Sequence, residues 1–150
     1  KKAGCESLEF GIESFSESVL KMMNKKITLK DIIKNIKWSK QAGIQTVIYL
    51  IVGFPGETDK DFRKTYHFLQ KYHKYIDYIQ SVRQFYIVPG SYVAENRDLY
   101  RITSLSFAED ILQKKWYIGT ENTYEIRMNR IKKILDLCKE KNIAYELHDE

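Results

Sequence analysis

Apolar runs alternate with amphipathic segments along the first half of the chain. The strand predicted over 45–52 contains a continuous apolar run rich in β-branched side chains, which is typical of a strand buried on both faces. Apolar runs at 8–12 and 78–85 predict two further strands. Helical periodicity predicts helices over the remaining segments, 17–23, 29–42 and 59–72. Strands that alternate with helices indicate a parallel sheet.

A glycine-rich turn follows the 45–52 strand. Gly53 ends the apolar run, and Pro55-Gly56 forces a tight turn. Thr58 and Asp61 then form a capping box, with Asp in place of the usual Glu, that starts the next helix. Similar cap signals precede the other two helices, at Ser16 and at Thr28–Asp31. In α/β folds, ligands bind at such carboxyl ends of strands, although an ordinary strand–helix turn has the same pattern.

The second half of the chain has a weaker pattern. Residues 92–119 predict a loop with a short helix near 107–112. Thr120 or Asn122 caps a long helix that extends to about Lys141, and 142–147 predicts a final short strand. The positions expected on the core-facing stripe of the long helix are Ile126, Ile131, Ile134, Leu135 and Cys138.

The fold class that follows is α/β, with a parallel sheet of consecutive βα units joined by right-handed crossovers. Three clear strands are too few for a closed eight-stranded barrel, so we expect a partial, half TIM-like barrel or a small open sheet. Residues 1–92 form the barrel part, and 93–150 form a C-terminal extension with the long helix, packed on the same domain.

Composition narrows the class of protein. The chain has 150 residues, of which 43% are hydrophobic and 30% charged, as in ordinary globular domains. No run reaches transmembrane length and no signal peptide opens the chain, so we expect no membrane partner. The two cysteines, Cys5 and Cys138, lie far apart and give neither a metal-ligand spacing nor a disulfide framework. These features favour a reducing compartment and a cytoplasmic location.

Charge leaves one alternative open. Lys plus Arg outnumber Asp plus Glu by 25 to 20, mostly on helix faces, where a solvated surface accounts for them. Eleven Tyr beside many Lys are also compatible with a module that stacks single-stranded RNA. No RNP-like or Arg-rich element is present, so we do not expect nucleic acid as the partner.

Chemistry-bearing residues gather at the predicted strand ends. Glu13 offers two acceptor oxygens suited to a ribose diol, or it merely caps the following helix. Lys25 can hold an anion, or it is a solvated charge. Gly53 removes a side chain where a planar ring can lie against backbone. Because the carboxyl ends of parallel strands converge, together these residues describe a site for a nucleoside that carries an acidic group.

Five motifs in one order carry a family resemblance: Ala3-Gly-Cys5, Phe10-Gly-Ile-Glu-Ser14, Val19-Leu-Lys-Met-Met-Asn-Lys25, Ala42-Gly-Ile44 and Ile51-Val-Gly-Phe-Pro-Gly-Glu-Thr58. They resemble the C-terminal half of a radical S-adenosylmethionine (SAM) enzyme core. The branch with a cobalamin-binding domain is the most similar, and methylthiotransferases come second. The resemblance covers roughly residues 1–92.

The resemblance implies residue roles. Glu13 and Ser14 would contact the SAM ribose, and Lys25 would pair with the methionine carboxylate. Ile51, with the backbone of Val52 and Gly53, would pack on the adenine. The segment around Phe85–Val88, with Tyr86 at its centre, would contact the adenine edge, and Pro89-Gly90-Ser91 resembles a turn near the substrate mouth. Tyr49 departs from the pattern, because some relatives have an acidic residue there.

The same resemblance implies a cofactor whose ligands this sequence lacks. Radical SAM enzymes hold a [4Fe-4S] cluster in a Cys-x3-Cys-x2-Cys loop, which is absent from these 150 residues. We therefore expect a fragment of a longer enzyme. It would bind the adenosyl group and line the site of an unknown substrate, its partner would be the N-terminal half of the same polypeptide, and alone it would be inactive. Cobalamin in the full-length protein is a further expectation.

A fragment of another nucleotide-binding TIM-like or Rossmann-like enzyme is the remaining alternative. Neither a Gly-x-Gly-x-x-Gly motif nor a Walker loop supports it.

Overall fold

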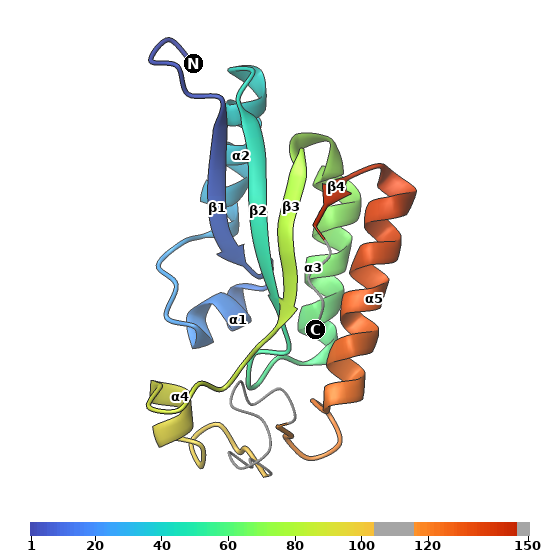
Figure 1. Ribbon diagram of the computed structural model, residues 1–150. Helices are drawn as coiled ribbons and strands as arrows, with labels where there is room; N and C mark the ends of the chain where they lie inside the picture. The colour runs from blue at the N-terminus through green and yellow to red at the C-terminus, as the bar shows by residue number, and fades with distance from the viewer. Residues whose placement is uncertain (104–115, 147–150) are drawn as a thin grey trace.

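Four parallel strands form a single sheet in the order β1-β2-β3-β4 (Figure 1). The computed structural model describes residues 1–103 and 116–146. The strands are β1 (Ser7–Glu13), β2 (Gln45–Val52), β3 (Tyr78–Gln84) and β4 (Ala144–Tyr145). The predicted α/β class and the parallel sheet of consecutive βα units are confirmed.

Three long helices cover one face of this sheet (Figure 1). They are α2 (Leu29–Gln41), α3 (Asp59–Tyr72) and α5 (Tyr124–Lys141), and a 3-10 turn, η1 (His73–Tyr75), follows α3. Alternate β2 residues, Ile48, Leu50 and Val52, are buried in one apolar core with side chains from all three helices. The short helices α1 (Glu17–Met22) and α4 (Tyr92–Glu95) lie beyond the carboxyl ends of the strands.

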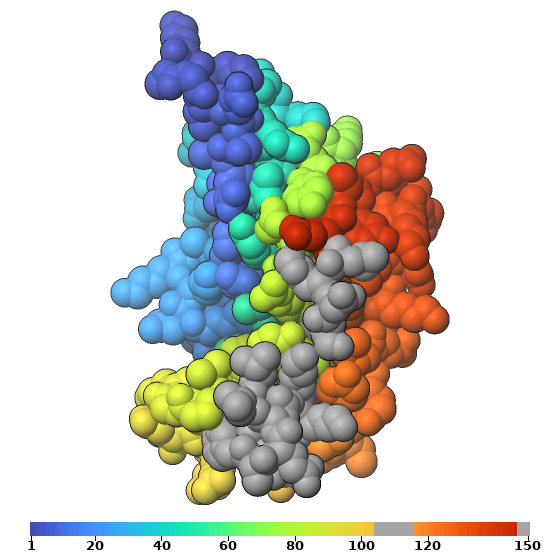
Figure 2. Space-filling model, viewed as in Figure 1, coloured from blue at the N-terminus to red at the C-terminus, as the bar shows by residue number. Residues whose placement is uncertain are grey.

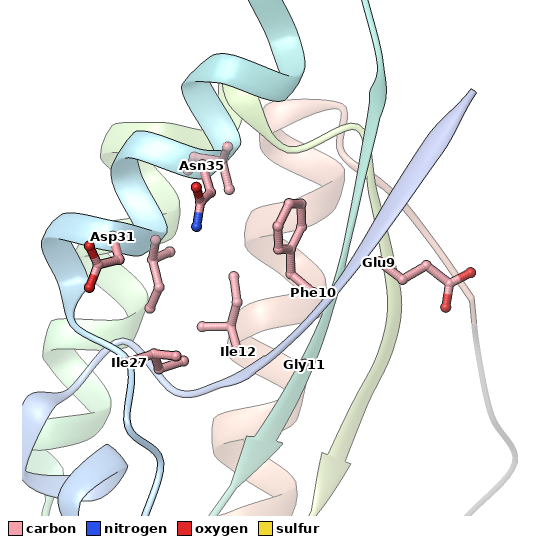
Figure 3. A pocket seen from close by; sticks show the side chains of 9 residues that line it. Glu9, Phe10, Gly11, Ile12, Ile27, Asp31 and Asn35 are labelled. Atoms are coloured by element: carbon pink, nitrogen blue, oxygen red, sulfur yellow. The ribbon is translucent and has the colours of Figure 1, made fainter. Parts of the chain in front are cut away.

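The opposite face of the sheet is turned toward the viewer in Figure 1. On β1, Glu9 points to the other side of the strand from Phe10 and Ile12 (Figure 3). Tyr49 of β2 shares this face, since its hydroxyl donates to Glu9 Oε2 at 2.6 Å. Because strand residues alternate between faces, we define the open face by Glu9, Gly11, Tyr49, Ile51 and Arg83.

Local cap signals explain where two of the helices begin. The capping box of Thr58 and Asp61 is confirmed, with both reciprocal hydrogen bonds at 3.2 Å. Thr28 Oγ1 accepts from Asp31 N–H at 3.1 Å, as expected. Ser16 stands at the N-cap of α1, but its predicted capping bond is absent. Its hydroxyl donates to Asp61 Oδ1 at 2.7 Å instead, because a charged acceptor from α3 lies within reach.

The long helix α5 differs from its prediction at its start and on its inner stripe. Its N-cap is Thr123, whose hydroxyl accepts from Ile126 N–H at 3.3 Å, so the cap assigned to Thr120 or Asn122 is wrong. Ile126 and Leu135 of the predicted stripe are only half-buried, whereas Ile131, Ile134 and Cys138 are buried. Arg127, Arg130 and Leu137 take the remaining inner positions, with 0%, 3% and 1% exposure.

Other element boundaries moved by one or two residues. The strands β1 and β3 run over Ser7–Glu13 and Tyr78–Gln84 rather than 8–12 and 78–85. The last strand covers only Ala144–Tyr145 of the predicted 142–147, of which 147 is outside the described residues. Within the expected 92–119 loop, α4 adds one helical turn, and the helix predicted near 107–112 also lies outside the described residues.

A second apolar core lies at the carboxyl ends of the strands. Phe54 from the turn after β2 and Ile87 from the segment after β3 pack there with the fully buried Trp116. The Trp116 indole N–H donates to the Phe85 carbonyl at 2.8 Å, which satisfies its polar atom. This core anchors the loops around the candidate site.

Candidate functional site

Glu13 and Lys25 meet at the carboxyl end of β1. Lys25 Nζ lies 3.2 Å from Glu13 Oε1 and donates to the Gly11 carbonyl at 3.0 Å. The register of β1 against β2 shifts between Phe10 and Glu13, and Glu13 has a φ of +69°. Such bulges re-aim a side chain, here onto the lysine that returns after α1. The side chains remain 17% and 36% exposed, so a ligand can reach this ion pair.

The pair lies beside Leu50, one residue before Ile51, and its charged atoms lie over Gly11 of the open face. Glu13 is the register partner of Leu50, and Ile51 is the register partner of Arg83 on β3. A Cβ added to Gly11 would lie 3.1 Å from Glu13 Oε1 and 3.7 Å from Lys25 Nζ. A carboxylate, a half-buried apolar side chain and an exposed guanidinium therefore follow one another across three neighbouring strands. Glu13, Lys25 and Ile51 are the predicted residues that the structure places on this face.

Ser14 and Val52 are turned away from the open face. Ser14 is fully buried; its Oγ lies 3.3 Å from Thr65 Oγ1 and accepts from Ser16 N–H at 3.2 Å. Val52 belongs to the core beneath the helices, and its carbonyl accepts from Phe85 N–H at 2.9 Å. Both residues support the strand ends from the helix-covered side of the sheet. Their expected contacts with the cofactor stay predictions.

The space expected beside Gly53 is filled by Arg127. A Cβ at Gly53, which has a φ of +78°, would lie 2.1 Å from Arg127 Cδ. The Gly53 N–H donates to Glu57 Oε2 at 2.7 Å, and its carbonyl accepts from Asn122 Nδ2 at 3.1 Å. The reason for placing a planar ring on this side of Gly53 is therefore wrong, because α5 already occupies that side.

The guanidinium of Arg127 is fully bonded inside the protein. It lies 4.0 Å from the centre of the Trp116 ring and donates to the Trp116 and Asn122 carbonyls, each at 2.9 Å. Its Nε donates to Gln84 Oε1 at 3.1 Å. Burial lowers the pKa of Arg127 to about 10, which still leaves it a cation at neutral pH. Arg127 thus ties α5 to the ends of β2 and β3.

Glu57 and Arg130 form a buried ion pair beside the same turn. Arg130 Nη1 donates to Glu57 Oε2 at 3.0 Å, and the two side chains are 4% and 2% exposed. Burial raises the pKa of Glu57 to about 7, against the opposing effects of Arg130 and the Gly53 N–H. Sequence reasoning missed both arginines. The available signal was their i, i+3 spacing next to Ile131 and Ile134, which continues one helical stripe.

Asp61 links α1 to α3. It accepts from the hydroxyls of Ser16 at 2.7 Å, Ser18 at 2.5 Å and Thr58 at 2.6 Å. Burial alone would raise the pKa of Asp61, but these hydroxyls and Lys64 hold it well below its usual range. This network fixes the helix that precedes Lys25, and so helps to set where Lys25 emerges.

The largest described cavity lies between α1, α4 and the ends of β2 and β3. Its volume is about 800 Å³. Figure 2 shows the α1 region in light blue above α4 in yellow, on the same side of the molecule. Its wall includes Phe85, Tyr86 and Val88 of the segment predicted to contact the adenine edge, and the turn residue Ser91. The remaining wall residues are Lys21, Met22, Met23, Asn24, Phe54, Tyr92, Val93 and Tyr100. Sequence reasoning did not assemble this set, because it comes from four separate segments.

A smaller cavity of about 220 Å³ lies between β1 and α2. Figure 3 shows Phe10 and Ile12 pointing into it from the strand, with Asp31 and Asn35 on the helix side. Glu9 and Gly11 also belong to its lining, but the Glu9 side chain points away from it, to the other side of the strand.

The described residues offer no metal-binding group. Within residues 1–103 and 116–146, no cluster of three or more His, Cys, Asp or Glu side chains is placed to hold a metal ion. Cys138 is buried, and burial raises its pKa to about 11, so the thiolate that binds metals is disfavoured at neutral pH. In the same part of the chain, every helix is too short or too polar to cross a membrane.

The first 69 residues of the chain match a known protein family. Residues 1–69 match the radical SAM superfamily. The match agrees with the predicted resemblance over these residues, which are less than half of the chain. The cobalamin-binding branch is not shown by the match, and the division of the chain at residue 92 stays a prediction.

Several curated proteins are similar in sequence to a comparable part of the chain. An uncharacterized methyltransferase of Pyrococcus horikoshii is 38% identical over 80 residues, which cover 53% of this chain and 17% of the relative. A tRNA-2-methylthio-N(6)-dimethylallyladenosine synthase of Desulfosudis oleivorans is 35% identical, covering 45% and 15%. The ribosomal protein uS12 methylthiotransferase RimO of Geotalea uraniireducens is 37% identical, with the same coverage. The chain thus matches less than a fifth of the length of these relatives.

A solved structure supports the fold. The archaeal Elp3 of Methanocaldococcus infernus, with residues 1–46 deleted, matches with a TM-score of 0.56 and 20% identity. The match covers 65% of this chain and 23% of the Elp3 chain. The four parallel strands in βα units therefore correspond to a partial TIM-like barrel.

Proposed function

We propose that this chain is part of a radical SAM enzyme and that its open face holds the adenosyl group of SAM. The observation that carries the proposal is the accessible Glu13–Lys25 pair at the carboxyl end of β1, one register position before Ile51 on β2. Glu13 would accept from the ribose hydroxyls, and Ile51 would pack against the adenine. Lys25 would exchange its contact with Glu13 for the methionine carboxylate.

The residues present fit SAM in part. The open face supplies an accessible carboxylate, an apolar contact and an ammonium group within a few strand spacings. Ser14, Val52 and Gly53 would not contact SAM directly. They would hold the strand ends, and so position Ile51 and Glu13. SAM would bring the radical chemistry of the whole enzyme, and this chain would bind and orient it.

The residues present do not fit a [4Fe-4S] cluster. Such a cluster takes cysteine thiolates, and Cys5 and Cys138 are the two cysteines of the chain. Cys138 is buried on the inner side of α5, remote in sequence from Cys5. The cluster ligands would therefore belong to another segment of the enzyme, and the isolated chain would be inactive. Cobalamin likewise stays a proposal for the whole protein, as do methyl transfer and methylthiolation, the reactions that the relatives' names suggest.

Saturation-transfer NMR with SAM tests this proposal on the chain itself. We expect saturation of the adenine and ribose protons, and about tenfold weaker binding for Glu13→Gln, since an acceptor for the ribose hydroxyls loses its charge. Glu17→Gln, an exposed carboxylate on α1, is the matched control and should bind like the unmodified chain. Equal binding by Glu13→Gln and Glu17→Gln, or no saturation at all, would contradict the proposal.

A second variant separates the role of Glu13 from that of the ion pair. Lys25→Met removes the pair but keeps the carboxylate. We expect saturation of the ribose protons to remain and saturation of the methionine protons to fall. Loss of both signals would show that the pair matters only for the shape of the strand end.

A nucleic-acid module is the second candidate, because lysines and tyrosines gather on the helical side. Lys37 Nζ lies 5.8 Å and 5.6 Å from the ring centres of Tyr72 and Tyr75, and Lys74 Nζ lies 5.3 Å from Tyr75. Rings beside cations can stack single-stranded RNA. Titration with polyuridylate at two salt concentrations tests it: tight binding with a steep salt dependence would favour this module, and weak binding would exclude it.

A further inference from the structure

The 800 Å³ cavity has a composition that is unusual for a packing gap. Five of the residues in its wall are aromatic: Phe54, Phe85, Tyr86, Tyr92 and Tyr100. Two methionines at the end of α1, Met22 and Met23, also line it, and Asn24 and Ser91 supply polar atoms. Its volume lies within the range of about 300–1,000 Å³ found for small-molecule pockets.

Contacts among its own residues hold part of the cavity wall in place. Phe54 is 5% exposed and meets Phe85 edge to face, with ring centres 4.8 Å apart. Tyr100 meets Phe54 in the same way at 6.0 Å. A Cβ added to Gly56 would lie 2.7 Å from Met22 Sδ, so this glycine lets the methionine pack against the turn after β2. The part of the wall formed by Phe54, Phe85 and Tyr100 is therefore preformed, whereas Tyr92 is exposed.

The polar groups in the wall are few and separate. Ser91 Oγ accepts from Ala94 N–H at 3.3 Å as the cap of α4. Burial raises the pKa of Tyr100, so its hydroxyl stays protonated and can donate. Lys21 on α1 is the one charged side chain in the described wall. This arrangement suits a ligand with a flat apolar body and one or two polar groups, rather than a sugar or a highly charged group.

We propose that this cavity binds a planar aromatic ring of a small molecule, held between the aromatic wall and the methionines of α1. Aromatic pairs prefer offset or edge-to-face contacts, and thioether sulfur adds favourable contacts at about 5 Å from a ring. The site is lined by none of Glu13, Lys25 and Ile51, although it includes Phe85, Tyr86 and Val88 from the segment predicted to contact the adenine edge. This ring-binding proposal extends the proposed function, because it names the kind of ring that the enzyme's substrate would carry. It rests on the proposed function only where it treats the ring as part of a substrate.

Methyl NMR of the methionines tests this site directly. The chain has three methionines, and Met128 lies outside the cavity on α5, near Gln84. With ¹³C-methyl methionine, titration with 2-naphthol should shift the Met22 and Met23 signals saturably and leave Met128 unchanged. Decahydro-2-naphthol, of the same ring size but saturated, should bind more weakly by about two- to tenfold, the value of an aromatic contact. SAM is absent, so the result is independent of the adenosyl proposal.

A surface variant shows whether the aromatic wall is responsible for binding 2-naphthol. Tyr92 is 64% exposed, so Tyr92→Ala should leave the fold intact and weaken 2-naphthol binding by about two- to tenfold. Trp38→Ala removes an aromatic side chain of similar exposure, 56%, from α2 and should change nothing. Equal affinity for the saturated ring, shifts at all three methionines, or no saturable shift would each overturn the proposal.

Discussion

Arg127 Cδ lies 2.1 Å from the position that a Cβ on Gly53 would take. The contact joins the turn after β2 to α5, across 74 positions of the chain. It exists because Gly53 has no side chain and because its φ of +78° suits glycine. The glycine thus serves the packing of an arginine rather than the approach of a ligand from that side.

Gly53→Ala should therefore destabilise the chain strongly. We expect a loss of about 2–5 kcal/mol in the free energy of unfolding, from about 1–2 for the left-handed backbone and about 1–3 for displacing Arg127. Urea unfolding followed by circular dichroism measures it. Gly43→Ala is the control: Gly43 also has a positive φ, +67°, but nothing lies within 4 Å of its Cβ position, so only the backbone cost remains. Equal losses would mean that the Arg127 contact is not close in solution.

The Glu57–Arg130 pair predicts a pH dependence. Burial raises the pKa of Glu57 from 4.5 to about 7, so between these values the folded chain holds a proton that the unfolded chain has lost. The free energy of unfolding should therefore fall as pH rises from about 5 to 7, by up to about 3 kcal/mol from this group. Urea unfolding at pH 5, 6, 7 and 8 measures the trend.

Glu57→Gln isolates that contribution. The amide keeps an oxygen acceptor for the Gly53 N–H and Arg130 but cannot titrate. We expect a flatter pH profile for this variant than for the unmodified chain. Parallel profiles would show that Glu57 is ionised throughout, held by Arg130.

Asp61 should matter more than its counterpart on α2. Asp61→Asn weakens the charged acceptor for the hydroxyls of Ser16, Ser18 and Thr58, and we expect a loss of about 1.5–3 kcal/mol at pH 7. Asp31→Asn changes the same helix position at the exposed cap of α2 and should cost less than Asp61→Asn. Since the pKa of Asp61 is lowered, the difference should shrink as pH falls below about 4. Equal losses at pH 7 would contradict the role of the α1–α3 network.

Much of the fold could be predicted from the sequence, because short sequence patterns determine where strands and helices form. The apolar run in β2 had to be a buried strand, and the Thr58–Asp61 box fixed the start of α3 to the residue. The start of α5 did not follow, because Thr120, Asn122 and Thr123 all suit a cap and only the packing of the helix selects among them.

The candidate site was predictable only where it depends on strand ends. Glu13 and Lys25 were expected together because parallel strands converge, and their direct pairing is a tertiary contact that no spacing encodes. The buried arginines were missed because arginine is normally solvated, and here Trp116, Asn122 and Gln84 supply the partners that make burial tolerable. The aromatic cavity was missed because four separate segments of the chain form it.

The most direct test of the central claim is the map of SAM contacts on the sheet. Amide ¹H–¹⁵N spectra of the chain, recorded during titration with SAM, report each strand end separately. We expect saturable shifts of the amide signals of Gly11, Glu13, Ile51 and Arg83. The amide signal of Gly43, at the opposite end of β2, should not shift. Shifts confined to the turn from Gly53 to Glu57, or no saturable shift on the open face, would contradict it.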